Sequence, residues 1–164
     1  MNRTLLLFTY YFSYAKGEAF VESEFPFLCK AFKKIIIVTN ELHQTDMRPV
    51  PENVIIIRHP YHPSFQSKIS ALPFIFSKLF WEELKFVKSK LNLRLTKNIL
   101  FTLMASIAKS KETRTFILNK VVAKYKLDLS NTWFYSYWMN DTAISLAMLK
   151  KEHPEAKIFC RAHR

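Results

Sequence analysis

Glycine is nearly absent from this sequence, because Gly17 is the only one among 164 residues. Phosphate-binding loops of the P-loop and dinucleotide-binding types need several glycines, since their backbone must approach the phosphates closely. Such loops are therefore excluded. Cysteine is also scarce, and both Cys29 and Cys160 fall in apolar segments. We expect reduced, buried thiols rather than a disulfide, and no metal site, because zinc needs more soft ligands at short spacing.

Acidic residues are few: 13 Asp and Glu stand against 25 Lys and Arg, which gives a net charge of +12. This excess favours an anionic partner, such as a membrane lipid, a nucleic acid or a phosphorylated ligand. The apolar content of 49% is sufficient for the core of one domain of this length. No apolar run approaches the ~18 residues that a membrane-spanning helix requires.

The first residues allow two interpretations. Arg3 and the apolar stretch 4–12 resemble the start of a secretory signal peptide. The aromatic side chains of that stretch favour a β-strand instead, and a helix signal follows directly. We expect a strand here, with a signal peptide as the alternative.

Five short apolar runs predict β-strands, at Leu5–Phe8, Ile35–Val38, Val54–Ile57, Trp133–Tyr137 and Lys157–Cys160. Their apolar residues are continuous rather than alternating, which is typical of strands buried on both faces of a parallel sheet. Helical patterns separate several of the strands. The sequence therefore predicts an α/β fold, a doubly wound parallel sheet with helices on both faces.

Two helices flank these strands. The first is expected over Glu18–Phe32, with a kink or break at Pro26 and an apolar stripe that includes Phe20. The second is expected over Asp141–Lys151, with Asn140 or Asp141 as its N-cap.

Residues 65–126 form a basic segment without a strand pattern. Between residues 60 and 126 there are thirteen Lys and Arg and only three Glu. One helix has an apolar stripe consisting of Phe76, Leu79, Phe80, Leu84, Val87 and Leu91. Its other face carries Lys78, Trp81, Lys85 and Lys88, a combination that suits the surface of an anionic membrane. An ordinary surface helix packed on the sheet is the alternative. Two further helices are expected at residues 98–108 and 113–125.

The loop after the first strand, residues 9–17, lies where ligands bind in open α/β sheets. Gly17 permits a backbone turn that other residues avoid, and Glu18 then begins a helix whose free N–H groups suit an anion or a sugar hydroxyl. A tight turn without function is the alternative. Glu22 lies one helical turn after Glu18, but acidic residues are common in first turns, so the pair is a weak signal for acid–base chemistry.

Three histidines follow predicted strands. His163, beside Arg161, follows the last strand and suits a ligand contact or a general base, with a structural role as the alternative. His59 and His62 follow the third strand and are interpreted as loop residues that line the cleft. A metal site there lacks a third ligand.

Three segments carry a family resemblance. They are Gly17-Glu18-Ala19-Phe20-Val21-Glu22-Ser23-Glu24-Phe25-Pro26-Phe27-Leu28, then Tyr135-Ser136-Tyr137-Trp138, then Arg161-Ala162-His163. In order and spacing they resemble the opening segment, the Y-S-Y-W marker and the S-R-A-H-G-x-D marker of bacterial GT-B glycosyltransferases of the family 4 type. Cys160 and Arg164 depart from that pattern, which has serine and glycine at these positions.

The resemblance implies a single Rossmann-like domain over residues 1–164, the N-terminal acceptor-binding half of a GT-B enzyme. It further implies that a donor-binding second domain, carrying an E-x7-E motif, is missing, so this chain alone would be inactive. Gly17, Glu18, Tyr137 and Arg161 would contact a lipid-linked or saccharide acceptor, and His163 would face the reaction centre.

The implied reaction transfers a hexose from a nucleotide sugar in surface polysaccharide synthesis, without metal or other cofactor. The protein would be cytoplasmic, peripheral at the inner face of the cytoplasmic membrane. The resemblance thereby favours membrane contact through Lys78, Trp81, Lys85 and Lys88 over an ordinary surface helix. Two alternatives remain: the membrane-recruiting subunit of a split glycosyltransferase, or a non-catalytic basic module that binds membrane or nucleic acid. No nucleic-acid partner is expected, because most aromatic residues lie in strands or helical stripes.

Overall fold

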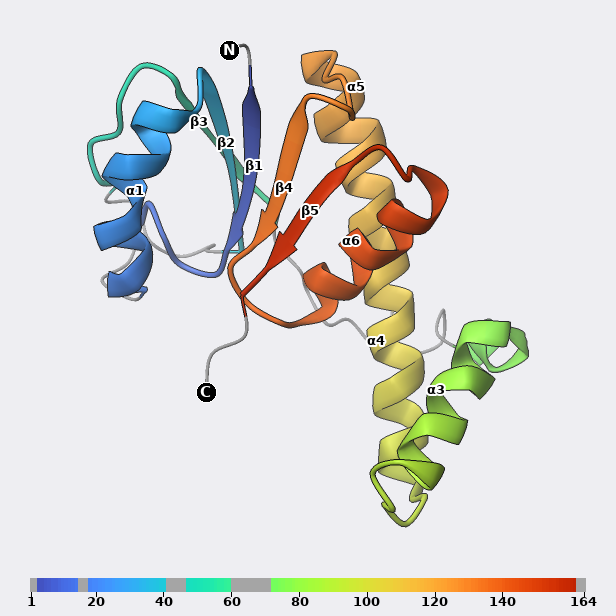
Figure 1. The fold of residues 1–164 in the computed structure, drawn as a ribbon. Coiled ribbons are helices and arrows are strands. Elements are labelled where there is room, and N and C mark those ends of the chain that lie inside the picture. Colours follow the sequence, from blue (N-terminus) through green and yellow to red (C-terminus); the bar gives the residue numbers. More distant parts are fainter. Residues whose placement is uncertain (1–2, 15–17, 41–46, 60–71, 162–164) are drawn as a thin grey trace.

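The computed structural model describes residues 3–14, 18–40, 47–59 and 72–161 (Figure 1). Its five strands are β1 (Thr4–Thr9), β2 (Lys34–Thr39), β3 (Val54–Arg58), β4 (Thr132–Ser136) and β5 (Lys157–Cys160). They form one sheet in the order β3-β2-β1-β4-β5, and every neighbouring pair is parallel. The predicted α/β fold with a parallel sheet is confirmed.

Helices cover both faces of the sheet, as predicted (Figure 1). Their bounds are α1 (Ala19–Ala31), η1 (Leu72–Phe76), α3 (Lys78–Ser89), α4 (Lys97–Phe116), the π-helical turn η2 (Ile117–Val122), α5 (Ala123–Tyr125) and α6 (Asp141–Glu152). The arrangement is Rossmann-like.

Strand alternation divides the core into two layers. Leu5 and Leu7 of β1 pack with residues of α1, whereas Leu6 and Phe8 pack with residues of η2 and α6. Each of these four side chains is at most 5% exposed. A continuous apolar strand is therefore required, because both of its faces are buried.

The sheet extends to both sides of β1, its central strand. The β1-α1-β2 and β4-α6-β5 units extend the sheet to opposite sides, with their helices on opposite faces (Figure 1). Right-handed crossovers require this arrangement. The topological switch point therefore lies between β1 and β4, at the carboxyl edge of the sheet.

Four expectations need correction. Residues 97–125 form one continuous helix through η2 rather than two helices. The expected break at Pro26 is wrong, because helix α1 continues through this residue, and Phe20 is 68% exposed rather than part of the buried stripe. Cys160 is free but exposed, because β5 is an edge strand covered on one side only.

Helix α3 and the first half of α4 form a helical arm, residues 72–108, that extends away from the sheet (Figure 1). Phe80 of α3 is buried against Met104 and Ile107 of α4. Leu79, Phe80 and Leu84 of the predicted stripe thus pack on α4 and not on the sheet. Phe76 and Leu91 do not belong to the buried stripe, since they are 89% and 52% exposed. The opposite face of α3 is exposed. Among the described residues, no helix is long and apolar enough to cross a membrane.

Candidate functional site

The loop after β1 is held by the carboxylate of Glu18. The backbone N–H groups of Tyr10, Tyr11 and Phe12 donate to this carboxylate at 3.0, 2.9 and 2.7 Å. The indole Nε1–H of Trp138, from the loop after β4, donates to the same group. We call these five residues the Glu18 cluster. It joins the two loops on either side of the switch point.

Glu18 adopts a left-handed backbone conformation, with φ 64° and ψ 44°. This conformation costs a residue with a Cβ atom about 1 kcal/mol relative to glycine. The four hydrogen bonds to its side chain hold it there. Gly17, to which the sequence assigned the turn, lies outside the described residues.

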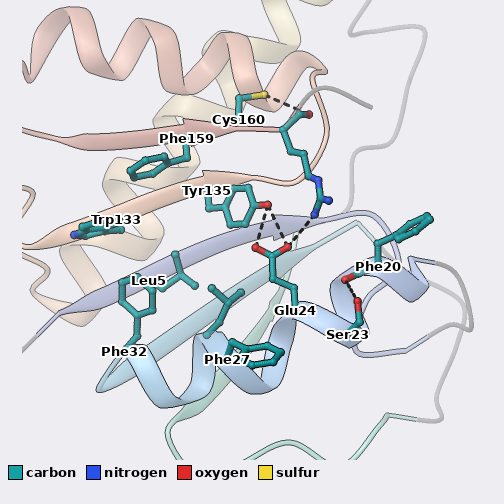
Figure 2. A pocket seen from close by; sticks show the side chains of 12 residues that line it. Leu5, Phe20, Ser23, Glu24, Phe27, Phe32, Trp133, Tyr135, Phe159 and Cys160 are labelled. Atoms are coloured by element: carbon teal, nitrogen blue, oxygen red, sulfur yellow. Dashed lines mark hydrogen bonds and ion pairs between the residues drawn. The ribbon is translucent and has the colours of Figure 1, made fainter. Parts of the chain in front are cut away.

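A second polar group lies on the α1 side of the edge (Figure 2). Glu24 of α1 accepts from the Tyr135 hydroxyl, at 3.4 Å to each oxygen, and from Arg161 at 3.0 Å. Burial, followed by the charge of Glu24, raises the pKa of Tyr135, so the hydroxyl remains protonated and donates. Arg161, predicted as an acceptor contact, is therefore tied to α1 and lies 5.5 Å from the Tyr137 ring.

Tyr137, also predicted as an acceptor contact, is 1% exposed. It packs in the α1-side core, with its ring 5.6 Å from that of Trp138. Burial raises its pKa, which keeps the phenol neutral. Its ring contacts the neighbouring Trp138 edge-on.

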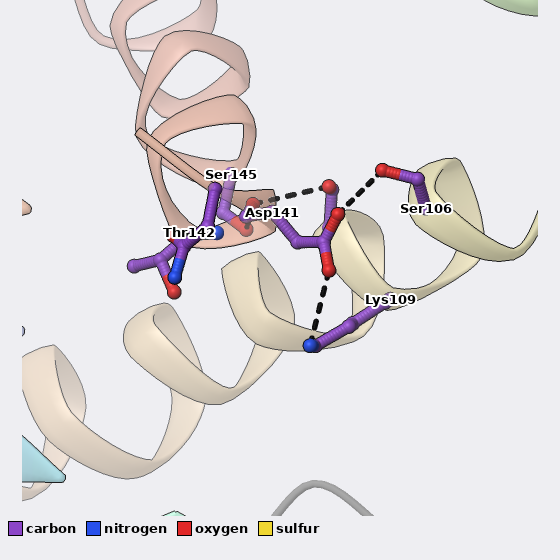
Figure 3. Close-up of polar contacts among 7 residues, drawn as sticks. Ser106, Lys109, Asp141, Thr142 and Ser145 are labelled. Carbon is purple, nitrogen blue, oxygen red and sulfur yellow. Dashed lines mark hydrogen bonds and ion pairs between the residues drawn. The ribbon is translucent and has the colours of Figure 1, made fainter. Parts of the chain in front are cut away.

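The start of α6 is fixed by a polar cluster with α4 (Figure 3). The Asp141 carboxylate accepts from Ser106 at 2.5 Å and pairs with Lys109 at 3.0 Å. Asn140 caps the helix by accepting from the Thr142 N–H at 3.0 Å, as the sequence predicted. Helix α4, which belongs to the helical arm, is thereby anchored to the loop that carries Trp138.

Two buried hydroxyls lie at the same edge. Thr9 is 4% exposed and Ser13 is 0% exposed, and neither hydroxyl has a hydrogen-bond partner in the part of the chain that the structure describes. Buried polar atoms usually have a partner, so each suits a hydrogen bond from a water molecule or a ligand.

His59 lies beyond β3, stacked on Phe116 with ring centroids 3.7 Å apart. Burial, with a smaller contribution from the charge of Lys109, lowers the pKa of His59 below its usual value. The neutral imidazole is therefore the form that fits the folded chain. His62 lies outside the described residues.

This lowered pKa gives a pH prediction. Below pH ~6.5 the unfolded chain binds a proton at His59 that the folded chain does not, so stability falls as pH decreases toward the lowered pKa. The stabilising contribution is fully present above the unfolded value of about 6.5 and is lost as the pH falls from there through the lowered pKa of the folded chain. His59→Gln should make the urea midpoint less dependent on pH between about pH 7 and pH 5. The matched control is His153→Gln, at the end of α6, which should keep the pH dependence of the unmodified chain. An unchanged pH dependence in His59→Gln would contradict this explanation.

The predicted membrane contacts share one face of α3. Lys78, Trp81, Lys85 and Lys88 follow helical spacing and are all exposed, with Trp81 56% exposed. Of the fifteen large hydrophobic residues that are exposed in the described part of the chain, eight lie between residues 72 and 101. The same span holds six cations and two carboxylates. The exposed surface of the arm thus combines apolar and basic side chains.

The structure brings some of the predicted site residues together and leaves others untested. Glu18, Tyr137 and Arg161 lie at one edge of the sheet, whereas the α3 face is separate from it. His163, the predicted catalytic residue, lies outside the described residues, as does Gly17. Sequence reasoning missed Trp138 and Glu24 as polar contacts. The signal for Trp138 was its position directly after a strand at the carboxyl edge, where a polar indole N–H needs a partner.

Comparison with known proteins gives no relative: no protein-family model, curated protein or solved structure matches the chain. Within the described ranges, no three His, Cys, Asp or Glu side chains are placed to hold a metal ion.

Proposed function

We propose that this chain is the acceptor-binding half of a GT-B glycosyltransferase that works at an anionic membrane surface. One observation carries the proposal. The three segments of the family resemblance, far apart in sequence, contact one another at the carboxyl edge. Glu18 of the first segment bonds Trp138 of the second, and Glu24 of the first bonds both Tyr135 of the second and Arg161 of the third. Since this fold hosts many activities, the contacts between segments, rather than the fold, support the function.

The edge has the chemistry that a saccharide needs. Saccharide acceptors present hydroxyls together with apolar ring faces, so aromatic rings beside hydrogen-bonding groups suit them. The Tyr10 and Trp138 rings lie 6.4 Å apart, and Tyr11 is 48% exposed. The buried hydroxyls of Thr9 and Ser13 lie in the same loop region.

Within this proposal, Glu18 and Tyr137 position other groups of the site. The Glu18 carboxylate already accepts four hydrogen bonds, so it shapes the loop that would hold the acceptor. Tyr137 supports Trp138. Arg161 orients the strand end that leads to His163, the proposed catalytic residue, and Gly17 completes the acceptor loop.

Donor binding and stabilisation of the leaving group would come from outside this domain. A nucleotide sugar would bind a second domain, and transfer would depend on positioning and on stabilising the departing diphosphate. The lipid-linked or saccharide acceptor would be reached at the inner face of the cytoplasmic membrane, where the helical arm contacts anionic lipid. The membrane-recruiting subunit of a split enzyme is the second candidate, favoured by the same exposed arm.

The test is ligand binding by saturation-transfer NMR on the purified chain. The probes are farnesyl-diphosphate-linked glucose and N-acetylglucosamine as acceptors, and UDP-glucose and GDP-mannose as donors. We expect saturation transfer to the acceptor saccharides and none to the nucleotide sugars. Trp138→Phe should weaken acceptor binding by about tenfold, since it removes the indole N–H that orders the loop. The matched control is Trp81→Phe on the arm.

Two results would overturn the proposal. Binding of nucleotide sugars without acceptors would make this a donor-binding domain. Binding of neither class, with the fold intact by circular dichroism, would leave the basic binding module as the better explanation, and salt-sensitive binding to nucleic acid would identify it.

A further inference from the structure

Part of one sheet face has no helix over it in the described structure. Helix α1 packs on the β1 and β2 part of its face, while α6 and the α4–α5 helix cover the opposite face (Figure 1). Beyond α1 the side chains of Trp133, Tyr135 and Phe159 line a pocket, and Phe159 is 46% exposed. Parallel sheets are normally covered by helices on both faces. This surface is therefore as apolar as a protein core, although no element of the described chain packs on it.

The uncovered surface is a groove of about 710 Å³ between α1 and β5 (Figure 2). Its floor consists of Leu5, Trp133, Tyr135 and Phe159, and its wall on α1 includes Phe20 and Phe27. Phe20 and Phe27 are 68% and 71% exposed, which is unusual for aromatic side chains on a helix that packs on a sheet. The lining runs from Phe32 and Trp133 at the amino edge to Arg161 at the carboxyl edge, so the groove spans the strands.

The charges at the amino edge indicate what fits the groove. Arg3 and Lys157 lie 5.7 and 5.8 Å from the Trp133 ring, at that end. The pKa of Asp128 is lowered chiefly by hydrogen bonds from Ser130 to its exposed carboxylate, and the charge of Lys157 makes a small further contribution. Helices that pack on parallel sheets run antiparallel to the strands, as α1 does, so their carboxyl ends lie at the amino edge. The partial negative charge of a helix carboxyl end, and acidic side chains near it, are stabilised by neighbouring cations. At the other end, Arg161 is already paired with Glu24.

We propose that this groove binds an amphipathic helix of a partner protein, parallel to α1, with acidic residues in its last turn. A second copy of this chain fits poorly. Its exposed amphipathic helix, α3, has Lys88 in its last turn and Lys90 directly after it, and these would face Arg3 and Lys157. The proposal goes beyond glycosyl transfer and does not depend on it.

The experiment uses two synthetic helical peptides with the same leucine-rich apolar face. One has three glutamates in its last turn and the other has three lysines. Binding is measured by fluorescence anisotropy of labelled peptide with the purified chain. We expect the acidic peptide to bind at least about tenfold more tightly, and Arg3→Glu with Lys157→Glu to abolish or reverse this preference.

Apolar contacts are tested separately. Phe159→Asp should reduce binding of the acidic peptide by about tenfold or more. Phe27→Asp, at an exposed helix position, tests the same groove without risk to the edge strand. Phe86→Asp on the arm is the matched control and should leave binding unchanged.

Three outcomes would overturn the proposal. The first is equal binding of both peptides. The second is a dimer in sedimentation velocity that dissociates in Phe27→Asp, which would assign the groove to a second copy. The third is loss of binding to phosphatidylglycerol vesicles in Phe27→Asp, which would assign it to lipid. The groove meets the candidate acceptor site at Glu24, Tyr135 and Arg161. Peptide, dimer and vesicle binding test the groove, whereas saturation transfer to the saccharides tests acceptor binding, so the failure of one proposal can be told from the failure of the other.

Discussion

Replacing Glu18 by alanine should lower the free energy of unfolding by about 2–4 kcal/mol. The substitution leaves the N–H groups of Tyr10, Tyr11 and Phe12 and the indole of Trp138 without their acceptor. Each unsatisfied buried donor costs about 1–3 kcal/mol. The sum is smaller here because Glu18 is partly exposed and the Tyr11 hydrogen bond is exposed, so water can replace part of the loss. Urea unfolding followed by circular dichroism measures the change.

Two further measurements of the free energy of unfolding test whether Glu18 contributes more than an ordinary surface carboxylate does. Glu22→Ala, one helical turn later, removes a pair with Arg48 at 2.7 Å and should cost at most about 1 kcal/mol, because Glu22 is 59% exposed. A double-mutant cycle of Glu18→Ala with Trp138→Phe should show coupling of about 1 kcal/mol or more. A cost for Glu18→Ala no larger than that of Glu22→Ala would show that water satisfies the loop equally well.

Glu18→Gly tests the backbone contribution. Glycine adopts the left-handed conformation of residue 18 freely, so this variant should be about 1 kcal/mol more stable than Glu18→Ala although both lack the carboxylate. The measurement is again the urea midpoint. Equal stability of the two variants would mean that the backbone changes conformation once the carboxylate is gone.

The sheet could be predicted from the sequence because its strands are apolar on both faces. Runs such as Ile35–Val38 have few structures available other than a doubly covered parallel strand. The continuous helix from 97 to 125 could not be predicted in this way. Its middle, Lys109 to Glu112, is polar and interrupts the apolar pattern. Lys109 and Ser110 are satisfied there by Asp141, which comes from a distant element and so cannot be included in a pattern along one helix.

The location of two candidate residues in the fold could be predicted, although their role stays a prediction. Glu18 begins the helix after the loop that follows the first strand, and Arg161, an acceptor contact by the family resemblance, follows the last strand, so both lie at the carboxyl edge. Their partners, Trp138 and Glu24, are separated from them by 120 and 137 residues. Such pairs depend on strand order, which sequence spacing does not give. The basic arm was easier to predict, since helical spacing alone aligns Lys78, Trp81, Lys85 and Lys88.

Neutralising three of these residues, Lys78→Gln, Lys85→Gln and Lys88→Gln together, should weaken binding to anionic vesicles by about 100-fold. Each basic group near such a surface contributes about 1 kcal/mol, so three correspond to about 3 kcal/mol. The measurement is co-sedimentation with phosphatidylcholine vesicles that contain phosphatidylglycerol, at low and high salt. Trp81 emission should shift to shorter wavelength on binding, because its exposed indole enters the lipid interface.

The matched control removes the same charge elsewhere. Lys120, Lys124 and Lys126 are also exposed but belong to the η2–α5 end of the helix, away from the α3 arm (Figure 1). The variant with all three of these lysines replaced by glutamine should keep most of its affinity for the vesicles if the membrane contacts only the α3 face. Equal losses in both variants would indicate attraction by net charge alone, without a defined face. Binding of the unmodified chain to nucleic acid but not to vesicles would contradict the membrane assignment altogether, because the same cations would then serve a polyanion of a different class.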